Sequence, residues 1–252
     1  MSIASRSAAV SLEKVRKQYG AVTAVEEVSI TIEPGTLVTL LGPSGCGKTT
    51  TLRMVAGLEM PTAGRILIGA KDVTLLPPNE RDVSMVFQSY ALFPHMTVLE
   101  NVSYGLASAA LSKAQRLEKA REGLRLVGLE GYDERLPSEL SGGQQQRVAC
   151  ARALVLEPQV LLFDEPLSNL DAKLRRRMRE EIRDLPQKLG LTVVMITHDL
   201  DSLVTICDRI AVLVDRKIKV GTLDELMRDP HPWIQSYFHG PRPYRRAACL
   251  IC

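Results

Sequence analysis

Short runs of apolar residues recur along the chain and end at polar or glycine-rich segments. The segments 36–41 (TLVTLL) and 160–163 (VLLF) are almost wholly apolar. Continuous apolar runs of this length are typical of parallel strands that are buried on both faces. We expect strands near 37–41, 83–87, 160–163, 192–197 and 210–214, and together they predict an α/β fold with a parallel-sheet core.

Two other patterns interrupt this core. Residues 8 to about 35 and 62–74 favour short strands with turns, and they predict a small antiparallel β-subdomain. Residues about 89–156 are helix-rich, with turn residues at Pro94, Gly128, Gly131 and Pro137. We therefore expect one domain over 1–225, with its core at about 8–88 and 157–225 and a helical subdomain at about 89–156. A short C-terminal tail, 226–252, follows.

Three local features add to this pattern. Pro186 falls within the helical stretch MREEIRDLPQKLG and should kink or end that helix at Leu185. The basic run 173–179 precedes Glu180 and Glu181, and at i,i+4 spacing Arg176 and Arg177 would pair with them on a solvated helix face. In the tail, Trp233, Tyr237 and Phe238 are expected to pack on the core in preference to a partner.

The apolar run at 36–41 leads into the loop 42–49 (GPSGCGKT), which matches G-x-x-x-x-G-K-[ST] in full. A helical stretch, TTTLRMVAGL, follows. Strand, glycine-rich loop and helix form a phosphate cradle in which backbone amides bind the phosphates. Lys48 would reach the β- and γ-phosphates of ATP, and the Thr49 hydroxyl would bind Mg²⁺.

A pair of acids follows the apolar run at 160–163. Asp164 and Glu165 stand at the carboxyl end of that expected strand, where open α/β sheets bind ligands. Asp164 can complete a Mg²⁺ shell. Glu165 can orient or deprotonate a water molecule for in-line attack on the γ-phosphate.

The run 140–144 (LSGGQ) precedes a stretch with helical spacing at Val148, Ala151 and Leu154. Ser141 stands where an N-cap is expected, so first-turn N–H groups lie exposed there. Gly142 and Gly143 lack side chains and allow a ligand close to the backbone. A helix start of this kind favours an anion such as phosphate.

These motifs together resemble the ATP-binding subunits of ABC transporters, over about residues 10 to 225. The resemblance implies a P-loop NTPase (RecA-like) core and several further roles. Tyr19 matches the aromatic that stacks on adenine, Gln88 the Q-loop glutamine near Mg²⁺, Ser168 to Asp171 the D-loop, and His198 the switch histidine that holds the γ-phosphate. The implied ATP-binding residues are Tyr19, Gly42, Pro43, Ser44, Gly45, Cys46, Gly47, Lys48, Thr49, Thr50, Gln88, Ser141, Gly142, Gly143, Gln144, Asp164 and Asp171. Catalysis is assigned to Lys48, Gln88, Glu165 and His198, and the metal ligands to Thr49, Gln88 and Asp164.

The resemblance also implies partners. Two such subunits would bind head to tail, as a homodimer or with a sister subunit, so that ATP lies between the P-loop of one and Ser141–Gln144 of the other. Transmembrane permease subunits would carry the solute, with a periplasmic solute-binding protein acting through the permease. Segments such as SGGQQQRVA and EPLSNLDAKLR resemble importers of polyamines, ferric iron, sulfate and sugars, which usually continue into a C-terminal regulatory domain. Because the tail here is short, we expect no such domain, and the tail resembles that of ATPases from Mce-type lipid transport systems. A soluble ABC ATPase outside transport is a further alternative.

Composition limits these choices further. The 252 residues carry a net charge of only +3, which gives no reason to expect nucleic acid. No stretch approaches the roughly 18 apolar residues of a membrane span, and charged residues interrupt the N-terminus, so we expect a cytoplasmic protein held at the membrane by its partners. Five cysteines, Cys46, Cys150, Cys207, Cys249 and Cys252, are odd in number and lack zinc-site spacing, so reduced thiols are expected.

Overall fold

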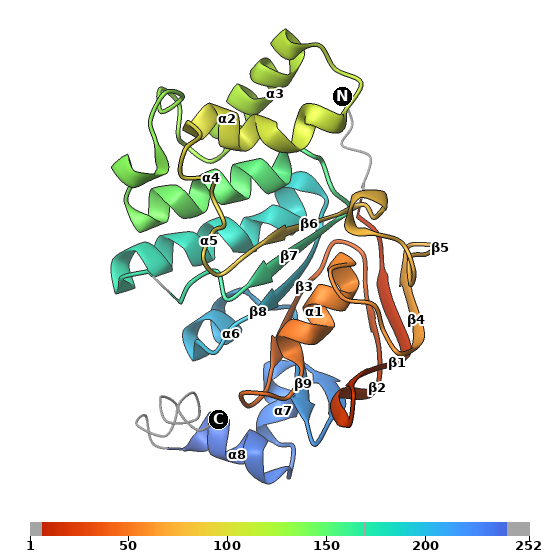
Figure 1. Cartoon of the computed structure of the whole chain (residues 1–252). Coiled ribbons are helices and arrows are strands. Elements are labelled where there is room, and N and C mark those ends of the chain that lie inside the picture. The colour runs from red at the N-terminus through yellow and green to blue at the C-terminus, as the bar shows by residue number, and fades with distance from the viewer. Residues whose placement is uncertain (1–6, 169, 241–252) are drawn as a thin grey trace.

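A six-stranded sheet forms the centre of the molecule (Figure 1). The computed structural model describes residues 7–168 and 170–240. The strand order is β10-β9-β3-β8-β7-β6, parallel except for the β10–β9 pair. The strands are β3 (Leu37–Leu41), β6 (Val83–Val86), β7 (Val160–Asp164), β8 (Thr192–Ile196), β9 (Arg209–Val214) and β10 (Lys217–Gly221). The parallel core predicted from the apolar runs is confirmed.

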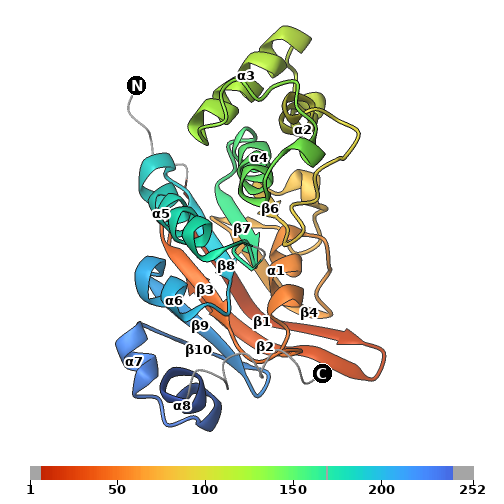
Figure 2. The ribbon, with the colours of Figure 1, turned by 90° about the vertical axis from the view of Figure 1, so that its left-hand side faces the viewer.

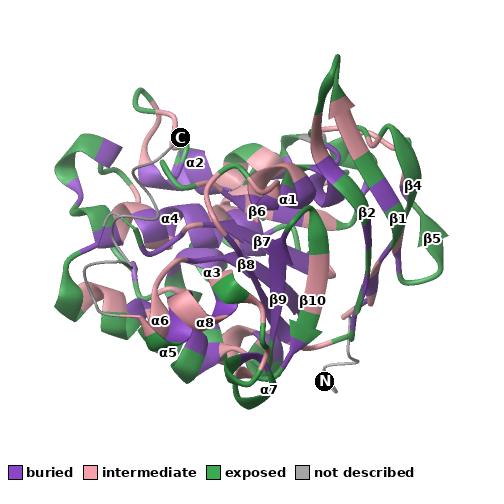
Figure 3. Cartoon of the chain, turned by 90° about the horizontal axis from the view of Figure 1, so that it is seen from below, coloured by how far each residue is buried: buried purple, intermediate pink, exposed green. Residues whose placement is uncertain are grey.

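Both faces of this sheet are covered, which explains its unbroken apolar runs (Figure 3). On β7, Val160 and Leu162 face the cluster that contains α1 (Lys48–Ala56), whereas Leu161 and Phe163 face the cluster that contains α4 (Gly142–Leu154) and α5 (Ala172–Leu189). Successive side chains of a strand point to opposite faces, so each strand contributes to two cores. The carboxyl ends of β3, β7 and β8 therefore stay fixed relative to one another.

A second sheet is antiparallel and has the order β2-β1-β4-β5. Its strands are β1 (Val10–Tyr19), β2 (Val22–Ile32), β4 (Ala63–Ile68) and β5 (Lys71–Asp72). Its apolar face joins α1 and one face of the central sheet in a single buried cluster. The short η1 helix (Pro78–Glu80) leads from this sheet to β6.

The segment between β6 and β7 is helical. It contains α2 (Val98–Ser103), η2 (Tyr104–Ser108), α3 (Lys113–Leu126), η3 (Pro137–Glu139) and α4. These helices share their own buried cluster, separate from those of the sheets. In Figures 1 and 2 they stand above the central sheet, with α4 nearest to it.

Helix α5 differs from expectation at Pro186. It continues past Leu185 to Leu189, so the alternative that the helix ends there is wrong. Met178, Ile182 and Pro186 are all buried and form one stripe at i, i+4 and i+8 against the sheet. Packing of that stripe offsets the hydrogen bond that proline cannot donate.

The basic run on α5 is only partly a solvated, paired face. Arg176 lies 3.7 Å from Glu180 as expected. Glu181 instead forms its ion pair with Arg147 of α4, which the sequence spacing did not predict. That pair joins the helical segment to the core.

The C-terminal helices α6 (Leu200–Ile206), α7 (Leu223–Met227) and α8 (Pro232–His239) cover the edge of the sheet near β9 (Figure 2). Tyr237 and Phe238 are buried, and Trp233 packs beside them, which confirms the expected packing on the core. No helix among the residues described is long and apolar enough to cross a membrane. Cys249 and Cys252 lie outside the described residues, while Cys46, Cys150 and Cys207 are free thiols.

Candidate nucleotide site

The glycine-rich loop turns tightly between β3 and α1, and two of its glycines are sterically required. A Cβ at Gly42 would lie 2.3 Å from the Leu213 carbonyl oxygen, and one at Gly47 would lie 2.5 Å from that of Ala24. Both residues also have positive φ, 154° and 97°, which glycine adopts at little cost. The loop is thus packed closely against neighbouring backbone, which fixes where its amides point.

Lys48 and Thr49 begin α1 beneath this loop. Lys48 is buried, and its Nζ donates to the carbonyl oxygens of Gly42 and Pro43 at 2.9 and 2.8 Å. The Thr49 hydroxyl lies 3.5 Å from Oδ1 of Asp164, across from the end of β7. Residues 115 positions apart thus provide a hydroxyl and a carboxylate at one place. Hard oxygen ligands of this kind suit Mg²⁺, which usually takes one or two protein ligands and completes its shell with phosphates and water.

Asp164 is held in an unfavourable setting for a charge. Burial raises the pKa of its carboxyl group, and repulsion from Glu165 raises it further, whereas Arg53, Thr49 and Lys48 act in the opposite direction. A cation bound at Thr49 and Asp164 would relieve this cost, because it favours the ionised carboxylate.

Glu165, one residue on, has the opposite electrostatics. Its hydrogen bond with His198 lowers the pKa of its carboxyl group in spite of burial, and the charges of His198 and Lys48 add to the effect. His198 Nε2 lies 3.5 Å from Glu165 Oε1, and Gln88 Nε2 lies 3.4 Å from Oε2. The carboxylate is therefore ionised near neutral pH and oriented from two sides.

The backbone at Glu165 supports this orientation. Its φ is 49°, a left-handed conformation that is uncommon outside glycine. Its N–H donates to the Ile196 carbonyl at 3.2 Å, and its own carbonyl accepts from the Ser168 hydroxyl at 3.0 Å. Non-glycine residues in such conformations cluster at functional sites. A depression of about 210 Å³, lined by Glu165, Ser168, His198 and neighbouring residues, opens beside it.

Ser141 is the N-cap of α4, as expected. Its hydroxyl accepts the Gln144 N–H at 3.4 Å, and the Gln144 side chain accepts the Ser141 N–H at 2.9 Å, so the two form a capping box. The two glycines differ, which the sequence did not show. A Cβ at Gly142 would have nothing closer than 4.0 Å, whereas one at Gly143 would lie 2.2 Å from Leu174 of α5. Gly142 faces open space and permits close approach by a ligand, while Gly143 permits close packing of α4 on α5.

Tyr19 lies at the end of β1, within hydrogen-bond reach of Thr50 and Glu59. Lys17 Nζ stands 4.7 Å from its ring centroid. The side chain is 46% exposed, so packing in the core does not explain it. Its position beside α1 suits an aromatic that contacts a base bound next to the P-loop.

Lys48 and Thr49 thus lie near Asp164 and Glu165 at the carboxyl ends of the parallel strands. Gln88 and His198 contact Glu165 from two sides. Residues 25–168 match the family model described as ABC transporter. The chain belongs to the ABC transporter family. It is an ATP-binding domain of that family, with the P-loop fold that its motifs imply.

Curated relatives of this ABC cassette carry iron-import names. The chain is 68% identical over 222 residues to "Fe(3+) ions import ATP-binding protein FbpC" of Rhizobium etli, covering 88% of this chain and 63% of that protein. It is 54% identical over 230 residues to FbpC 1 of Haemophilus influenzae, covering 91% and 70%. The cassette therefore spans less than two thirds of the Rhizobium protein.

Solved cassettes share the fold. One is the ATP-binding cassette MJ0796 in a dimeric post-hydrolysis state bound to ADP and Pi, which is 34% identical with a TM-score of 0.74 and covers 85% of this chain and 98% of that one. Another is the cassette MJ1267 in its ADP conformation, 27% identical with a TM-score of 0.81, covering 93% and 99%.

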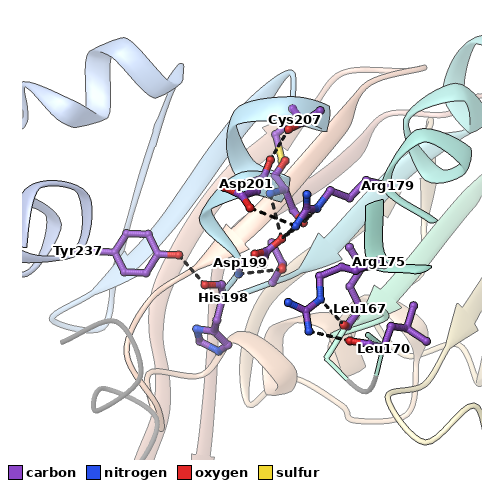
Figure 4. Close-up of polar contacts among 12 residues, drawn as sticks. Leu167, Leu170, Arg175, Arg179, His198, Asp199, Asp201, Cys207 and Tyr237 are labelled. Carbon is purple, nitrogen blue, oxygen red and sulfur yellow. Dashed lines mark hydrogen bonds and ion pairs between the residues drawn. The ribbon is translucent and has the colours of Figure 1, made fainter. Parts of the chain in front are cut away.

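Two arginines of this ABC cassette were missed by sequence reasoning. Arg175 donates to the carbonyls of Leu167 and Leu170 at 3.2 and 2.8 Å, within the segment that leads to Asp171 (Figure 4). Arg179 donates to Asp199, beside His198, at 3.1 and 2.6 Å. Both had been placed on a solvated face. The available signal was their spacing: the two arginines lie four residues apart, and each precedes a buried residue of α5, Met178 or Ile182, by three positions.

Other expected site residues make contacts of a different kind. The Asp171 carboxylate accepts the Leu174 N–H at 2.9 Å and caps α5, a structural role that the sequence did not suggest. Its contact with nucleotide stays a prediction. Asn169, in the same D-loop, lies outside the described residues. Cys46 lies in the loop with its Sγ 3.7 Å from Lys48 Nζ, and burial raises the pKa of its thiol.

Proposed function

We propose that this cassette is the ATP-hydrolysing subunit of a membrane importer of the ferric-iron type. The observation that carries the proposal is the convergence of Lys48, Thr49, Asp164, Glu165 and His198 at the carboxyl ends of β3, β7 and β8. The iron-import names of its relatives suggest the cargo. The Mce-type alternative suggested by the tail gains no support from these relatives.

The residues divide the work of phosphoryl transfer. The loop amides and Lys48 bind the β- and γ-phosphates and stabilise their charge. Thr49 and Asp164, with Gln88, would hold Mg²⁺, which neutralises phosphate charge when it is bound. Glu165 accepts a hydrogen bond from the attacking water. Because its pKa is lowered, Glu165 orients that water more effectively than it removes a full proton. His198 fixes Glu165 and contacts the γ-phosphate.

The second half of the site comes from another copy of the chain. The start of α4 offers a capped helix N-terminus with Gly142 open to approach. Such a terminus binds phosphate. We infer that Ser141–Gln144 of one copy cover the ATP held by Lys48 and Thr49 of the other, so that ATP holds a head-to-tail homodimer together and hydrolysis releases it.

A groove between the core and the helical segment suits the permease. It has a volume of about 450 Å³, and its walls include Leu58, Phe87, Tyr104 and Leu156. Three of these, Leu58, Tyr104 and Leu156, are 46%, 53% and 45% exposed. We infer that a short amphipathic helix from the cytoplasmic side of the permease docks here, beside Gln88, and holds the cassette at the inner face of the membrane. A periplasmic iron-binding protein would deliver the cargo to that permease.

The first experiment measures Mg²⁺-dependent ATP hydrolysis by the purified chain. Glu165→Gln should bind ATP, accumulate as a dimer and lose at least about a hundredfold in turnover. Glu13→Gln makes the same chemical change at an exposed ion pair on β1 and should be neutral. Unchanged hydrolysis in Glu165→Gln would remove that residue from its role, and a wild-type chain without hydrolysis would refute the function.

The shared site is tested by mixing two inactive variants. Lys48→Ala disables the P-loop, and Ser141→Arg disables the covering helix start. A mixed dimer contains one intact site only if each site takes residues from both copies, so mixing should restore hydrolysis. Dilute Ser141→Arg should also retain ATP affinity. An inactive mixture, or a matching loss of that affinity, would argue for a site complete within one chain.

The cargo is tested in cells. Deleting the gene should abolish Fe(III) uptake, and a Glu165→Gln copy should not restore it. Normal Fe(III) uptake in the deletion strain, with ATPase activity intact in vitro, would reject the cargo and leave the ATPase assignment standing.

A further inference from the structure

The C-terminal helix α8 reaches the catalytic loop through one hydrogen bond. The Tyr237 hydroxyl donates to the carbonyl oxygen of His198 at 2.9 Å. In Figure 4 that hydroxyl approaches the carbonyl side of His198, while the imidazole points away from it. The imidazole is thus left to contact Glu165, 3.5 Å away. Through this bond Tyr237 acts on the backbone of the loop that carries the histidine.

The loop around His198 is held firmly on its other sides. Before it, the Ile196 carbonyl accepts the Glu165 N–H at 3.2 Å. After it, the Asp199 N–H donates to the Thr197 hydroxyl at 3.1 Å, and its carboxylate accepts from Arg179 at 2.6 Å. The peptide between His198 and Asp199 is therefore held at both ends, by the Thr197 hydroxyl at its N–H and by the Tyr237 hydroxyl at its carbonyl, and without the second bond it has more freedom to rotate. Rotation there would move the imidazole relative to Glu165.

Tyr237 is itself held rigidly. Its ring stacks on Trp233 with centroids 5.2 Å apart and planes 19° apart, and it makes a T-shaped contact with Phe238 at a centroid distance of 5.2 Å. Only 8% of the residue is exposed. A hydroxyl on a packed ring has few alternative directions, so it constrains its acceptor more than a mobile side chain would.

The helix that carries Tyr237 is anchored to the central sheet. Asp229, just before α8, accepts from Lys219 of β10 at 2.8 Å. His231 caps the helix: its Nδ1 accepts the Trp233 N–H at 3.2 Å, so Nε2 carries the proton donated to Asp215 at 2.9 Å. The position of α8 is therefore transmitted to the His198 loop through Tyr237.

We propose that Tyr237 is a positioning residue for ATP hydrolysis, and that the placement of α8 sets how well His198 aligns Glu165. The proposal rests on the ATPase function given above. It makes the C-terminal helix a control point, because any partner or chain segment that shifts α8 changes turnover without touching the nucleotide.

The test replaces Tyr237 by phenylalanine in the full chain, which deletes the hydroxyl and keeps the aromatic packing. Loss of one ordinary hydrogen bond should lower kcat by about 3–10-fold. The KM for ATP should not change, because the bond that is lost joins α8 to the backbone carbonyl of His198 and not to a nucleotide-binding group. Trp233→Phe is the matched control: it alters the same aromatic stack, keeps the hydroxyl and should leave kcat within about twofold, with a similar change in Tm.

A second arm separates positioning from general damage. In a His198→Gln background, Tyr237→Phe should cause no further loss of kcat, because the group that it positions is already replaced. Equal losses in both backgrounds, equal losses in Trp233→Phe and Tyr237→Phe, or an unchanged kcat in Tyr237→Phe would each overturn the proposal. If the wild-type chain hydrolysed no ATP, the proposed function would fail instead, so the two failures are distinguishable.

Discussion

Asp164 should destabilise the free protein while it stabilises the loaded one. The residue is 8% exposed and lies beside Glu165, and its carboxylate accepts a long hydrogen bond from Thr49 at 3.5 Å. Asp164→Asn removes the charge and keeps the shape. Substitutions that relieve strain at functional sites commonly add about 0.5–2 kcal/mol to the free energy of unfolding. For a chain of this size that equals a rise in Tm of roughly 1–8 °C without nucleotide.

The pH dependence follows from the raised pKa of Asp164. A group whose folded pKa lies above its unfolded value favours folding at low pH, and this contribution is lost as pH rises through the folded pKa. The advantage of Asp164→Asn should therefore be absent at about pH 4, near the unfolded pKa of aspartate, and reach its full value at neutral pH.

Bound Mg²⁺-ATP should reverse the order of stability. A ligand at 100 times its Kd stabilises the folded state by about 2.7 kcal/mol. The variant, lacking a metal ligand, should gain less than the wild type. Thermal unfolding between pH 4 and 8, with and without Mg²⁺-ATP, measures both effects. Asp208→Asn, at an exposed carboxylate that accepts the Leu37 N–H at 2.7 Å, is the control and should not raise Tm. A lower Tm for nucleotide-free Asp164→Asn at neutral pH would refute the reasoning.

Two further predictions compare neighbouring positions. Gly142→Ala should leave Tm nearly unchanged and lower turnover at least about tenfold, because a bound ligand would approach that face of the helix. Gly143→Ala should lower Tm, because its Cβ would meet Leu174. The reverse pattern in paired melting and ATPase assays would contradict the assignment. Arg175→Ala should lower turnover several-fold by freeing the backbone before Asp171, while the exposed Arg176→Ala should stay within about 0.5 kcal/mol of wild type in unfolding experiments and keep its activity. Equal activities for the two arginine variants would count against a positioning role for Arg175.

Much of the fold and of the nucleotide chemistry could be predicted from local sequence. The apolar runs at 37–41 and 160–163 predicted β3 and β7 because strands buried on both faces need apolar residues at every position. The P-loop could be predicted because all the features that it requires, the glycines of its tight turn and one lysine, lie within eight consecutive residues. Ser141 was recognised as a cap because capping is a contact across one helical turn.

Other features depended on contacts between distant parts of the chain. Pro186 remains helical because its ring lies on the buried stripe of α5, and local propensity contains no record of that burial. Arg175 and Arg179 face the catalytic loops, although their neighbours Arg176 and Arg177 are exposed, because the packing of Met178 and Ile182 sets the rotation of the helix.

The sequence by itself determined the nucleotide-binding class, since its motifs are short and each is specified by local backbone geometry. Only the tertiary structure decided which groups meet: Thr49 with Asp164, Glu165 with His198, and the His198 carbonyl with Tyr237. Those pairs are separated by 115, 33 and 39 positions in the chain. Packing of the strands and helices brings these pairs within hydrogen-bonding or ion-pair range. Local sequence patterns do not show which distant residues this packing will bring together.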